Sequence, residues 1–254
     1  MLQIERLPLL QDNYAWLLLE PRSGTSGVVD PAEAEPVLAR LRELGRGLHL
    51  ILCTHHHQDH VGGNLELKKA TSCRVVGPAR DAARIPGLDM GVAEGHSLPF
   101  GATHARILET PGHTRGHIAY WFEAARALFC ADTLFALGCG RLFEGDAATM
   151  QRSLAKLRAL PDDARVFCGH EYTLANARFA LTVDPENAAL RERARQIEAR
   201  RARGEPTVPS ELGEEKRTNP FLRWDDPAIR RTLGLEAAGD AEVLGEIRAR
   251  KDRF

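Results

Sequence analysis

Four of the ten histidines lie in one short segment, T-H-H-H-Q-D-H at 54–60. Imidazole nitrogens and carboxylate oxygens are the ligands that zinc and the neighbouring divalent metals take in proteins. The segment directly follows an apolar run at 48–53, which predicts a buried strand whose end would fix the loop. We therefore predict that this loop provides metal ligands, namely His55, His57, Asp59 and His60.

Three further candidate ligands each follow another apolar run that predicts a strand. They are His113, Asp132 and His170. Open sheets commonly place their active sites at the carboxyl ends of their strands, so we expect these side chains to complete the site. A carboxylate has two oxygens, and Asp132 can therefore bridge two ions. The predicted sets are His55, His57, His113 and Asp132 for one metal, and Asp59, His60, His170 and Asp132 for the other.

Other residues of ligand type lack this support. His56 points away from its neighbours if side chains alternate, and Asp30 is predicted to start a turn more readily than to support the metal loop. The remaining histidines are predicted to be structural or surface residues: His49, His96, His104 and His117. The cysteines within apolar strands are predicted to be small buried side chains: Cys53, Cys130 and Cys168.

Composition is that of an ordinary folded protein, with 43% hydrophobic and 27% charged residues among 254. A net charge of −1 gives no bulk reason to expect nucleic acid or a membrane surface as partner. The longest apolar run, 15–19, is far too short to span a membrane. Five cysteines without a C-x-x-C pair suit a reducing compartment. We expect a cytoplasmic monomer.

Alternating strand and helix patterns up to about residue 170 predict a mixed α/β class. Apolar residues at the three-and-four spacing predict a helix over 34–44 that stops at Gly45. The other predicted elements are a helix over 150–160 and strands over 14–19, 48–54, 118–122, 127–131 and 164–168.

After about residue 171 the strand signals disappear and helical patterns remain. Asp184-Pro185 predicts the start of a helix that ends at Gly204, and 204–220 is predicted to be an irregular connection. Asp226 and Asp240 are predicted to cap two further helices. The chain is therefore expected to divide into an α/β part, 1–170, and a smaller helical part, 171–254.

Several motifs together resemble known families. The segment at 54–60, T-P-G-H-T-R-G-H at 110–117 and A-D-T-L-F at 131–135 resemble the metallo-β-lactamase superfamily. More specifically, the chain is similar to the bacterial form of the glyoxalase II, or hydroxyacylglutathione hydrolase, family. The motifs that carry this likeness are G-C-G-R-L-F-E-G at 138–145, C-G-H-E-Y-T at 168–173, N-P-F at 219–221 and K-D-R-F at 251–254.

The resemblance covers essentially the whole chain and implies both fold and activity. It implies a metallo-β-lactamase αββα sandwich, a catalytic domain over 1–170, followed by a smaller C-terminal α-helical domain over 171–254 that binds substrate. It implies two divalent metal ions, with Zn²⁺ expected and iron or manganese as alternatives. The implied reaction is hydrolysis of S-D-lactoylglutathione to glutathione and D-lactate, the second step of methylglyoxal detoxification.

The resemblance also implies a glutathione site formed by Arg141, Phe143, Tyr172, Arg248 and Lys251. The eukaryotic version has lysine and tyrosine at 141 and 143, so Phe143 is expected to contribute packing or its backbone. Glutathione carries two carboxylates, which requires local cations in a nearly neutral protein. Arg248 and Lys251 are three residues apart and would share a helix face.

The expected chemistry is attack of hydroxide on the thioester carbonyl. Two ions about 3.5 to 4 Å apart lower the pKa of a shared water from about 15.7 toward 7. Asp59 and Asp132 are therefore expected to act in catalysis through the metal-bound hydroxide.

Other functions remain open from the residues alone. Within the superfamily they are a persulfide dioxygenase with one iron, a phosphodiesterase or a nuclease, although a nuclease should present a wider basic surface. Outside it, the alternative is a metal-binding module without catalysis. The absence of closing cysteines among the ligands argues against a sealed structural zinc site.

Overall fold

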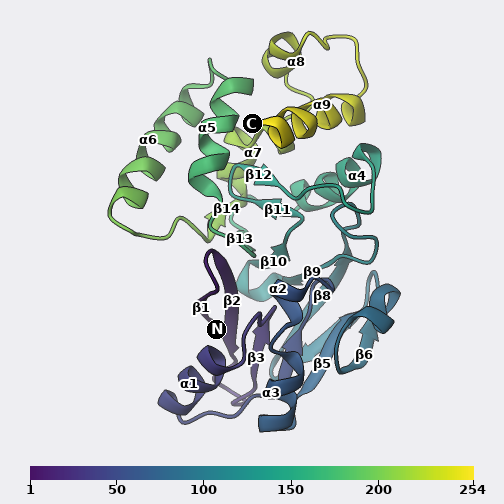
Figure 1. Cartoon of the computed structure of the whole chain (residues 1–254), viewed down its shortest axis with the longest axis vertical. Coiled ribbons are helices and arrows are strands. Elements are labelled where there is room, and N and C mark those ends of the chain that lie inside the picture. Colours follow the sequence, from purple (N-terminus) through teal and green to yellow (C-terminus); the bar gives the residue numbers. More distant parts are fainter. The chain divides into compact units, whose positions relative to one another are not determined.

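The computed structural model describes residues 1–254 and divides them into two compact units (Figure 1). Unit 1 consists of residues 1–109 and 115–131, and unit 2 of residues 110–114 and 132–254. The chain therefore passes between the units at 109/110, 114/115 and 131/132. No helix has both the length and the apolar character needed to cross a membrane.

The first sheet of unit 1 has the strand order β1-β2-β3-β4-β5-β6. Its first three strands are antiparallel, and β3 to β6 run parallel. Parallel strands end at the same edge of a sheet, so the segments that follow β3 and β4 lie side by side. The strands are β1 Gln3–Leu9, β2 Asn13–Leu19, β3 Ser26–Val29, β4 Leu50–Leu52, β5 Arg74–Pro78 and β6 Leu88–Val92.

The second group of strands in unit 1 is antiparallel, with β7, β8, β9 and β10 as successive neighbours. It faces the first sheet, because the Tyr120 hydroxyl of β9 donates to the Cys53 carbonyl oxygen at 2.9 Å. The Phe100 ring of β7 also closes over Gly27 of β3. The strands are β7 Ser97–Phe100, β8 Thr103–Glu109, β9 Ile118–Phe122 and β10 Ala127–Ala131.

Helices cover the other face of the first sheet. Val37 and Leu41 of α1 and Leu67 of α3 share one buried apolar cluster with Ile51 and Val75 of the sheet. The spacing of the apolar residues that predicted a helix over 34–44 is the spacing that buries this face, so that prediction is confirmed. The helices of unit 1 are α1 Glu35–Glu43, α2 Gln58–Val61, α3 Asn64–Thr71, η1 Ala79–Arg84 and η2 Glu123–Ala125.

Unit 2 is mainly helical. Its strands form the hairpin β11–β12 and the antiparallel pair β13–β14, and α5 and α6 lie side by side (Figure 1). Its strands are β11 Leu134–Phe135, β12 Gly138–Cys139, β13 Arg165–Cys168 and β14 Ser210–Glu211. Its helices are α4 Ala147–Arg158, α5 Thr173–Val183, α6 Ala188–Ala202, α7 Leu212–Thr218, η3 Pro220–Leu222, α8 Pro227–Leu233 and α9 Asp240–Arg253.

Three local predictions in unit 2 were wrong. Helix α6 begins after Asn187, whose side chain accepts from the Leu190 amide, and not at Asp184-Pro185. Asp184 instead accepts a hydrogen bond from the Asn187 side chain. Residues 204–220 contain β14 and α7 and are not irregular. The N-cap of α9 is Gly239, and Asp240 is already helical, whereas Asp226 caps α8 as predicted.

Candidate metal centre

The predicted ligands of unit 1 lie together directly after β4. The ring of His55 lies 4.2 Å from that of His60 and 4.8 Å from that of His57, measured between centroids. Asp59 Oδ2 lies 3.5 Å from His60 Nε2. The loop therefore gathers three imidazoles and one carboxylate within one short stretch of backbone.

Glycine at 62 allows the loop to lie against the turn after β3. A β-carbon at Gly62 would stand 2.5 Å from the Ala32 carbonyl oxygen, closer than any side chain permits. The φ angle of Gly62 is −58°, so it needs room and not an unusual backbone conformation. The close approach places α2 and its ligands beside the segment that carries Asp30.

Asp30 orients two of the candidate ligands. Its carboxylate accepts from the Thr54 amide and hydroxyl at 2.8 and 2.7 Å, and lies 3.2 Å from His60 Nδ1. Since the Thr54 hydroxyl hydrogen is committed to Asp30, the contact of 2.9 Å between Thr54 Oγ1 and His55 Nδ1 is donated by the histidine. The expectation that Asp30 mainly starts a turn was wrong, because its carboxylate supports the loop at 54–60.

The predicted ligands of unit 2 also lie together. The two oxygens of Asp132 face different histidines, with Oδ2 at 3.4 Å from His113 Nε2 and Oδ1 at 3.4 Å from His170 Nε2. Two donors bound to one ion at about 2.0–2.2 Å in tetrahedral geometry lie about 3.4 Å apart. Asp132 therefore has the geometry of a carboxylate that presents one oxygen to each of two ions.

His113 is held in the tautomer that a metal requires. Its Nδ1 lies 2.9 Å from the Arg141 carbonyl oxygen, and a carbonyl only accepts, so Nδ1 carries the hydrogen. Nε2, the nitrogen beside Asp132, therefore keeps the lone pair that binds a metal. Gly140 makes this packing possible, because a β-carbon there would lie 2.0 Å from the Asp132 carbonyl oxygen.

Three of the five predicted glutathione residues line one pocket of about 350 Å³ in unit 2: Arg141, Phe143 and Arg248. The Phe143 side chain is 61% exposed, and its ring lies 5.2 Å from that of His113. Arg248 is buried; its Nη1 donates to the Cys139 carbonyl oxygen at 2.7 Å, and its Nη2 to Asp252 at 3.0 Å.

The other two predicted glutathione residues lie near the start of α5. The Tyr172 ring stacks on that of His170 at 4.6 Å, nearly parallel. Lys251 Nζ donates to the Ala175 carbonyl oxygen at 3.2 Å and lies 5.2 Å from the centre of the Phe179 ring. Burial and the neighbouring guanidinium groups of Arg248 and Arg141 lower the pKa of Lys251 to about 8.

The histidines outside the predicted set have other partners. His56 Nδ1 lies 3.2 Å from Asp81 Oδ2, and its other nitrogen contacts Arg84. His49 Nδ1 accepts from the Ser26 amide at 3.1 Å. His117 is buried and its ring stacks on that of His55 at 4.8 Å.

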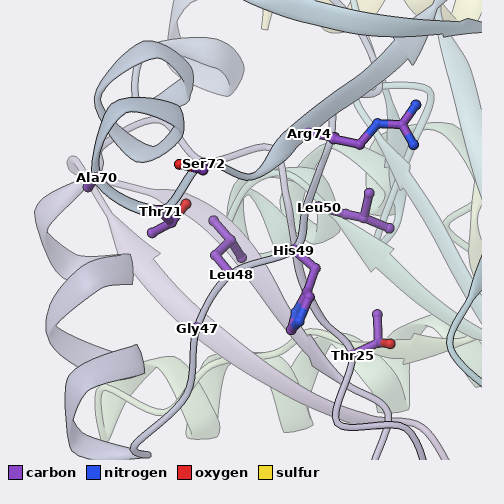
Figure 2. A pocket seen from close by; sticks show the side chains of 9 residues that line it. All are labelled: Thr25, Gly47, Leu48, His49, Leu50, Ala70, Thr71, Ser72 and Arg74. Carbon is purple, nitrogen blue, oxygen red and sulfur yellow. The ribbon is translucent and has the colours of Figure 1, made fainter.

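A larger pocket of unit 1, of about 710 Å³, is shown in Figure 2. It is lined by Thr25, residues 47–50 that lead into β4, residues 70–72 at the end of α3, and Arg74. These are the amino ends of the parallel strands, opposite to the end that carries the histidine cluster. The pocket contains none of the predicted ligands.

None of the five cysteines forms a disulfide bond and all five are buried, as predicted for those in apolar strands. Burial raises the pKa of the Cys168 thiol to about 12 and that of Cys139 to about 11. Such thiols are poor nucleophiles and poor metal ligands near neutral pH.

Two residues near the candidate site had no place in the sequence-based prediction. Asn13 donates to the Asp59 carboxylate, and Asp252 lies between Arg248 and Arg141 in the pocket. Asn13 is far from 54–60 in the sequence and has no ligand-type side chain, so no local signal marks it. Asp252 lies in the K-D-R-F motif at 251–254, where no role was predicted for its carboxylate.

Comparison with known proteins places the whole chain in families. Residues 15–170 match the model of the metallo-beta-lactamase superfamily, and residues 171–254 match that of the hydroxyacylglutathione hydrolase C-terminus. The hydroxyacylglutathione hydrolase of Methylococcus capsulatus is 59% identical over 254 residues, covering 100% of this chain and 99% of the relative. That of Mesorhizobium japonicum is 54% identical over 252 residues, covering 99% of each.

Solved structures share the fold. ETHE1 from Myxococcus xanthus superposes with a TM-score of 0.68 at 24% identity, covering 98% of each chain. TTHA1623, solved in a di-iron-bound form, has a TM-score of 0.61 at 26% identity, covering 87% of this chain and all of that one.

These matches confirm the predicted fold class, a metallo-β-lactamase fold with a C-terminal helical region. More than half of the residues are identical to those of full-length relatives, and both family models match. These findings together determine the family of the chain. The chain belongs to the hydroxyacylglutathione hydrolase family of the metallo-β-lactamase superfamily.

Proposed function

We propose that this chain is a metal-dependent thioester hydrolase that converts S-D-lactoylglutathione and related 2-hydroxyacylglutathiones, with water, to glutathione and the hydroxy acid. Full-length relatives at 54–59% identity are named hydroxyacylglutathione hydrolases. The observation that carries the chemistry is Asp132, whose two oxygens stand at ligand spacing from two different histidines.

The donor sets of the two units support divalent metal binding. The seven predicted ligands are five imidazoles and two carboxylates. We propose one ion on His55, His57, His113 and Asp132, and a second on Asp59, His60, His170 and Asp132. TTHA1623, a related structure, was solved in a di-iron-bound form, and for this chain we expect Zn²⁺, with iron or manganese as alternatives.

Metal ions in such a site supply an activated water at neutral pH and stabilise the charge that develops on the thioester oxygen. The chain's own residues set the geometry for this chemistry. Asp30 and the Arg141 carbonyl fix the histidine tautomers, and Asp132 would fix the spacing of the two sites. The thiol of glutathione, the leaving group, has a pKa of about 8.5, so its thiolate can depart without a strong general acid.

The pocket residues are proposed to bind the glutathione part of the substrate. Arg141 and Lys251 would attract its carboxylates, and the exposed ring of Phe143 offers an apolar contact beside His113. Tyr172, stacked on His170, would lie between the metal ligands and the pocket residues. Arg248 donates a hydrogen bond to the Cys139 carbonyl oxygen. It would act mainly by fixing the backbone of β12, which precedes Arg141 and Phe143.

We expect the protein to act as a monomer in the cytoplasm, where the buried thiols stay reduced. A small-molecule substrate, without nucleic acid or membrane, fits a chain of net charge −1. The division into a catalytic domain, 1–170, and a substrate-binding domain, 171–254, is part of this proposal.

One preparation can test the proposal. The loss of the S-D-lactoylglutathione thioester is followed in the ultraviolet, and the metal content of the same sample is measured by elemental analysis. We expect rapid hydrolysis and two equivalents of metal. Oxygen uptake with a persulfide substrate, or phosphodiester cleavage, without thioester loss would overturn the assignment, as would metal binding with no activity at all.

A further inference from the structure

Asn13 contacts a candidate ligand that lies far from it in the sequence. It is the first residue of β2, directly after the turn of the β1–β2 hairpin, and its side chain is buried. Its Nδ2 donates to the Asp59 carboxylate oxygen Oδ2 at 3.0 Å and to the Asp59 carbonyl oxygen at 3.1 Å. Both amide hydrogens are therefore committed to one residue.

Asp59 needs such a support more than an ordinary buried ligand does. Its side chain is 42% exposed and it stands in the first turn of α2, a helix of only four residues without a side-chain cap. A helix this short has little stability of its own. An aspartate in a first turn can also rotate to bond nearby backbone amides, which would turn its carboxylate away from a metal.

The hydrogen bond from Asn13 fixes the Asp59 oxygen that faces His60. Asp59 Oδ2, which accepts from Asn13, is the oxygen that lies 3.5 Å from His60 Nε2. That distance is close to the separation of about 3.4 Å expected for two donors on one ion. His60 is oriented separately by Asp30, so the Asn13 contact acts on the carboxylate partner of this pair.

The hairpin that carries Asn13 is itself anchored. Leu9 pairs with Asn13 across the hairpin, and the Leu10 amide in the turn donates to the Glu33 carboxylate at 2.9 Å. The donor therefore comes from a fixed position of the sheet and not from a mobile loop.

From these contacts we propose that Asn13 is a positioning residue for the second metal: its amide group holds the Asp59 carboxylate at ligand distance from His60. The inference rests on the proposed function, because it takes Asp59 as a metal ligand. Partners that orient metal ligands typically contribute about 10- to 100-fold to metal affinity. Loss of the amide should therefore weaken one of the two sites and leave the other unchanged.

The test compares Asn13→Ala and Asn13→Asp with the wild-type chain. Each zinc-loaded protein is exposed to a graded series of a chelator, and the zinc retained is measured by elemental analysis. We expect one equivalent to be lost from Asn13→Ala at about 10- to 100-fold lower chelator strength than from wild type. Asn13→Asp keeps the shape but faces one carboxylate with another, so it should lose that equivalent at least as readily.

Asn64→Ala is the matched control. Asn64 is buried in the same unit and donates to Cys53 Sγ at 3.2 Å and to the Pro86 carbonyl oxygen at 3.3 Å. It makes no contact with a candidate ligand, so its loss should change the thermal midpoint and not the retention of one ion relative to the other.

Three outcomes would overturn the inference while leaving the two-metal proposal intact. Unchanged retention of both ions in Asn13→Ala refutes it alone, and equal weakening of both ions shows a merely structural role. Wild-type retention in Asn13→Asp shows that shape, and not the amide hydrogen, is what counts. A wild-type chain that binds a single ion would instead overturn the two-metal proposal and this inference together.

Discussion

At the scale of single residues, hydrogen bonds decide which nitrogen of each histidine can bind a metal. The Nδ1 atoms of His55, His60 and His113 face a hydroxyl, a carboxylate and a carbonyl oxygen. Each acceptor holds the hydrogen on Nδ1 and leaves the Nε2 lone pair toward the candidate centre. The choice is made before any ion arrives, which lowers the cost of ordering the ligands on binding.

Asp132 provides the most direct test among the ligands. Asp132→Ala should lose both metals, because both proposed sites share this carboxylate, and turnover should fall by about a thousandfold or more. Metal analysis and the thioester assay on one sample check this. Asp146→Ala, which removes only the N-cap of α4 in the same unit, should keep both metals. Near-native turnover of Asp132→Ala would contradict the two-metal site.

The lowered pKa of Lys251 predicts that substrate binding depends on pH. Because its pKa is lowered to about 8, the ammonium loses its charge as the pH rises through about 8. The attraction for the substrate carboxylates is then lost, so KM should rise between pH 7 and 9 while kcat changes little. Asp252 opposes this shift, and Arg248 and Arg141 favour it.

Substitution at the same position provides the control. Lys251→Arg stays charged over this range and should abolish the rise in KM, whereas Lys251→Ala should raise KM about tenfold or more at pH 7. A KM that is unchanged in Lys251→Ala would remove this residue from the substrate site.

Residue types and spacing predicted the candidate ligands well because metal ligands must be histidine or carboxylate. The structure brings the predicted residues together within each unit, although their metal binding stays a prediction. The contact of Asn13 and the role of Asp30 were not predicted, because asparagine and aspartate are common residues without a distinctive local pattern. Only the pairing of β2, β3 and β4 places them beside the loop at 54–60.

At the scale of elements, buried polar side chains of unit 2 form hydrogen bonds with the backbone of the β11–β12 hairpin. Glu215 Oε2 accepts from the Leu137 amide at 2.9 Å, and Glu215 Oε1 pairs with Arg193 at 2.5 Å. Asn219 Nδ2 donates to the Phe135 and Gly138 carbonyl oxygens, both at 3.1 Å. This network fixes the segment between Asp132 and the pocket residues.

Glu215→Ala should therefore destabilise the protein strongly. It leaves the Arg193 guanidinium buried without its closest partner, which typically costs about 3–5 kcal/mol. Urea unfolding measures the change. Glu214→Ala is the matched control, because Glu214 also pairs with Arg193, at 3.1 Å, but is 38% exposed and should contribute only about 0–1 kcal/mol. Equal effects of the two variants would show that burial does not set the energy here.

Element positions were predicted best where apolar periodicity was clear. Helix α1 followed its pattern, whereas α6 did not start at its apparent signal. Asp184-Pro185 has the composition of a helix start, but Asp184 is engaged with Arg223 Nε at 3.3 Å and with Asn187. The Asp184 carboxylate, which the local sequence predicts to be a helix cap, forms an ion pair with Arg223 instead. Arg223 is distant in the sequence, so no local pattern could predict this contact.

At the scale of the whole molecule, metal binding should contribute to stability. A ligand that binds only the folded state adds about 1.4 kcal/mol to the free energy of unfolding for each tenfold rise in its concentration above Kd, per site. Two sites predict a slope of about twice that value. Urea unfolding at several buffered zinc concentrations measures the slope, and a slope of one site would contradict a pair of ions.

The order of the chain through the two units has a consequence for synthesis on the ribosome. All seven candidate ligands have been synthesised once residue 170 is made, yet the groups that fix the hairpin after Asp132 come later, from Arg193, Glu215 and Arg248. A nascent chain would thus carry Asp132 before it has the groups that hold the following segment in place.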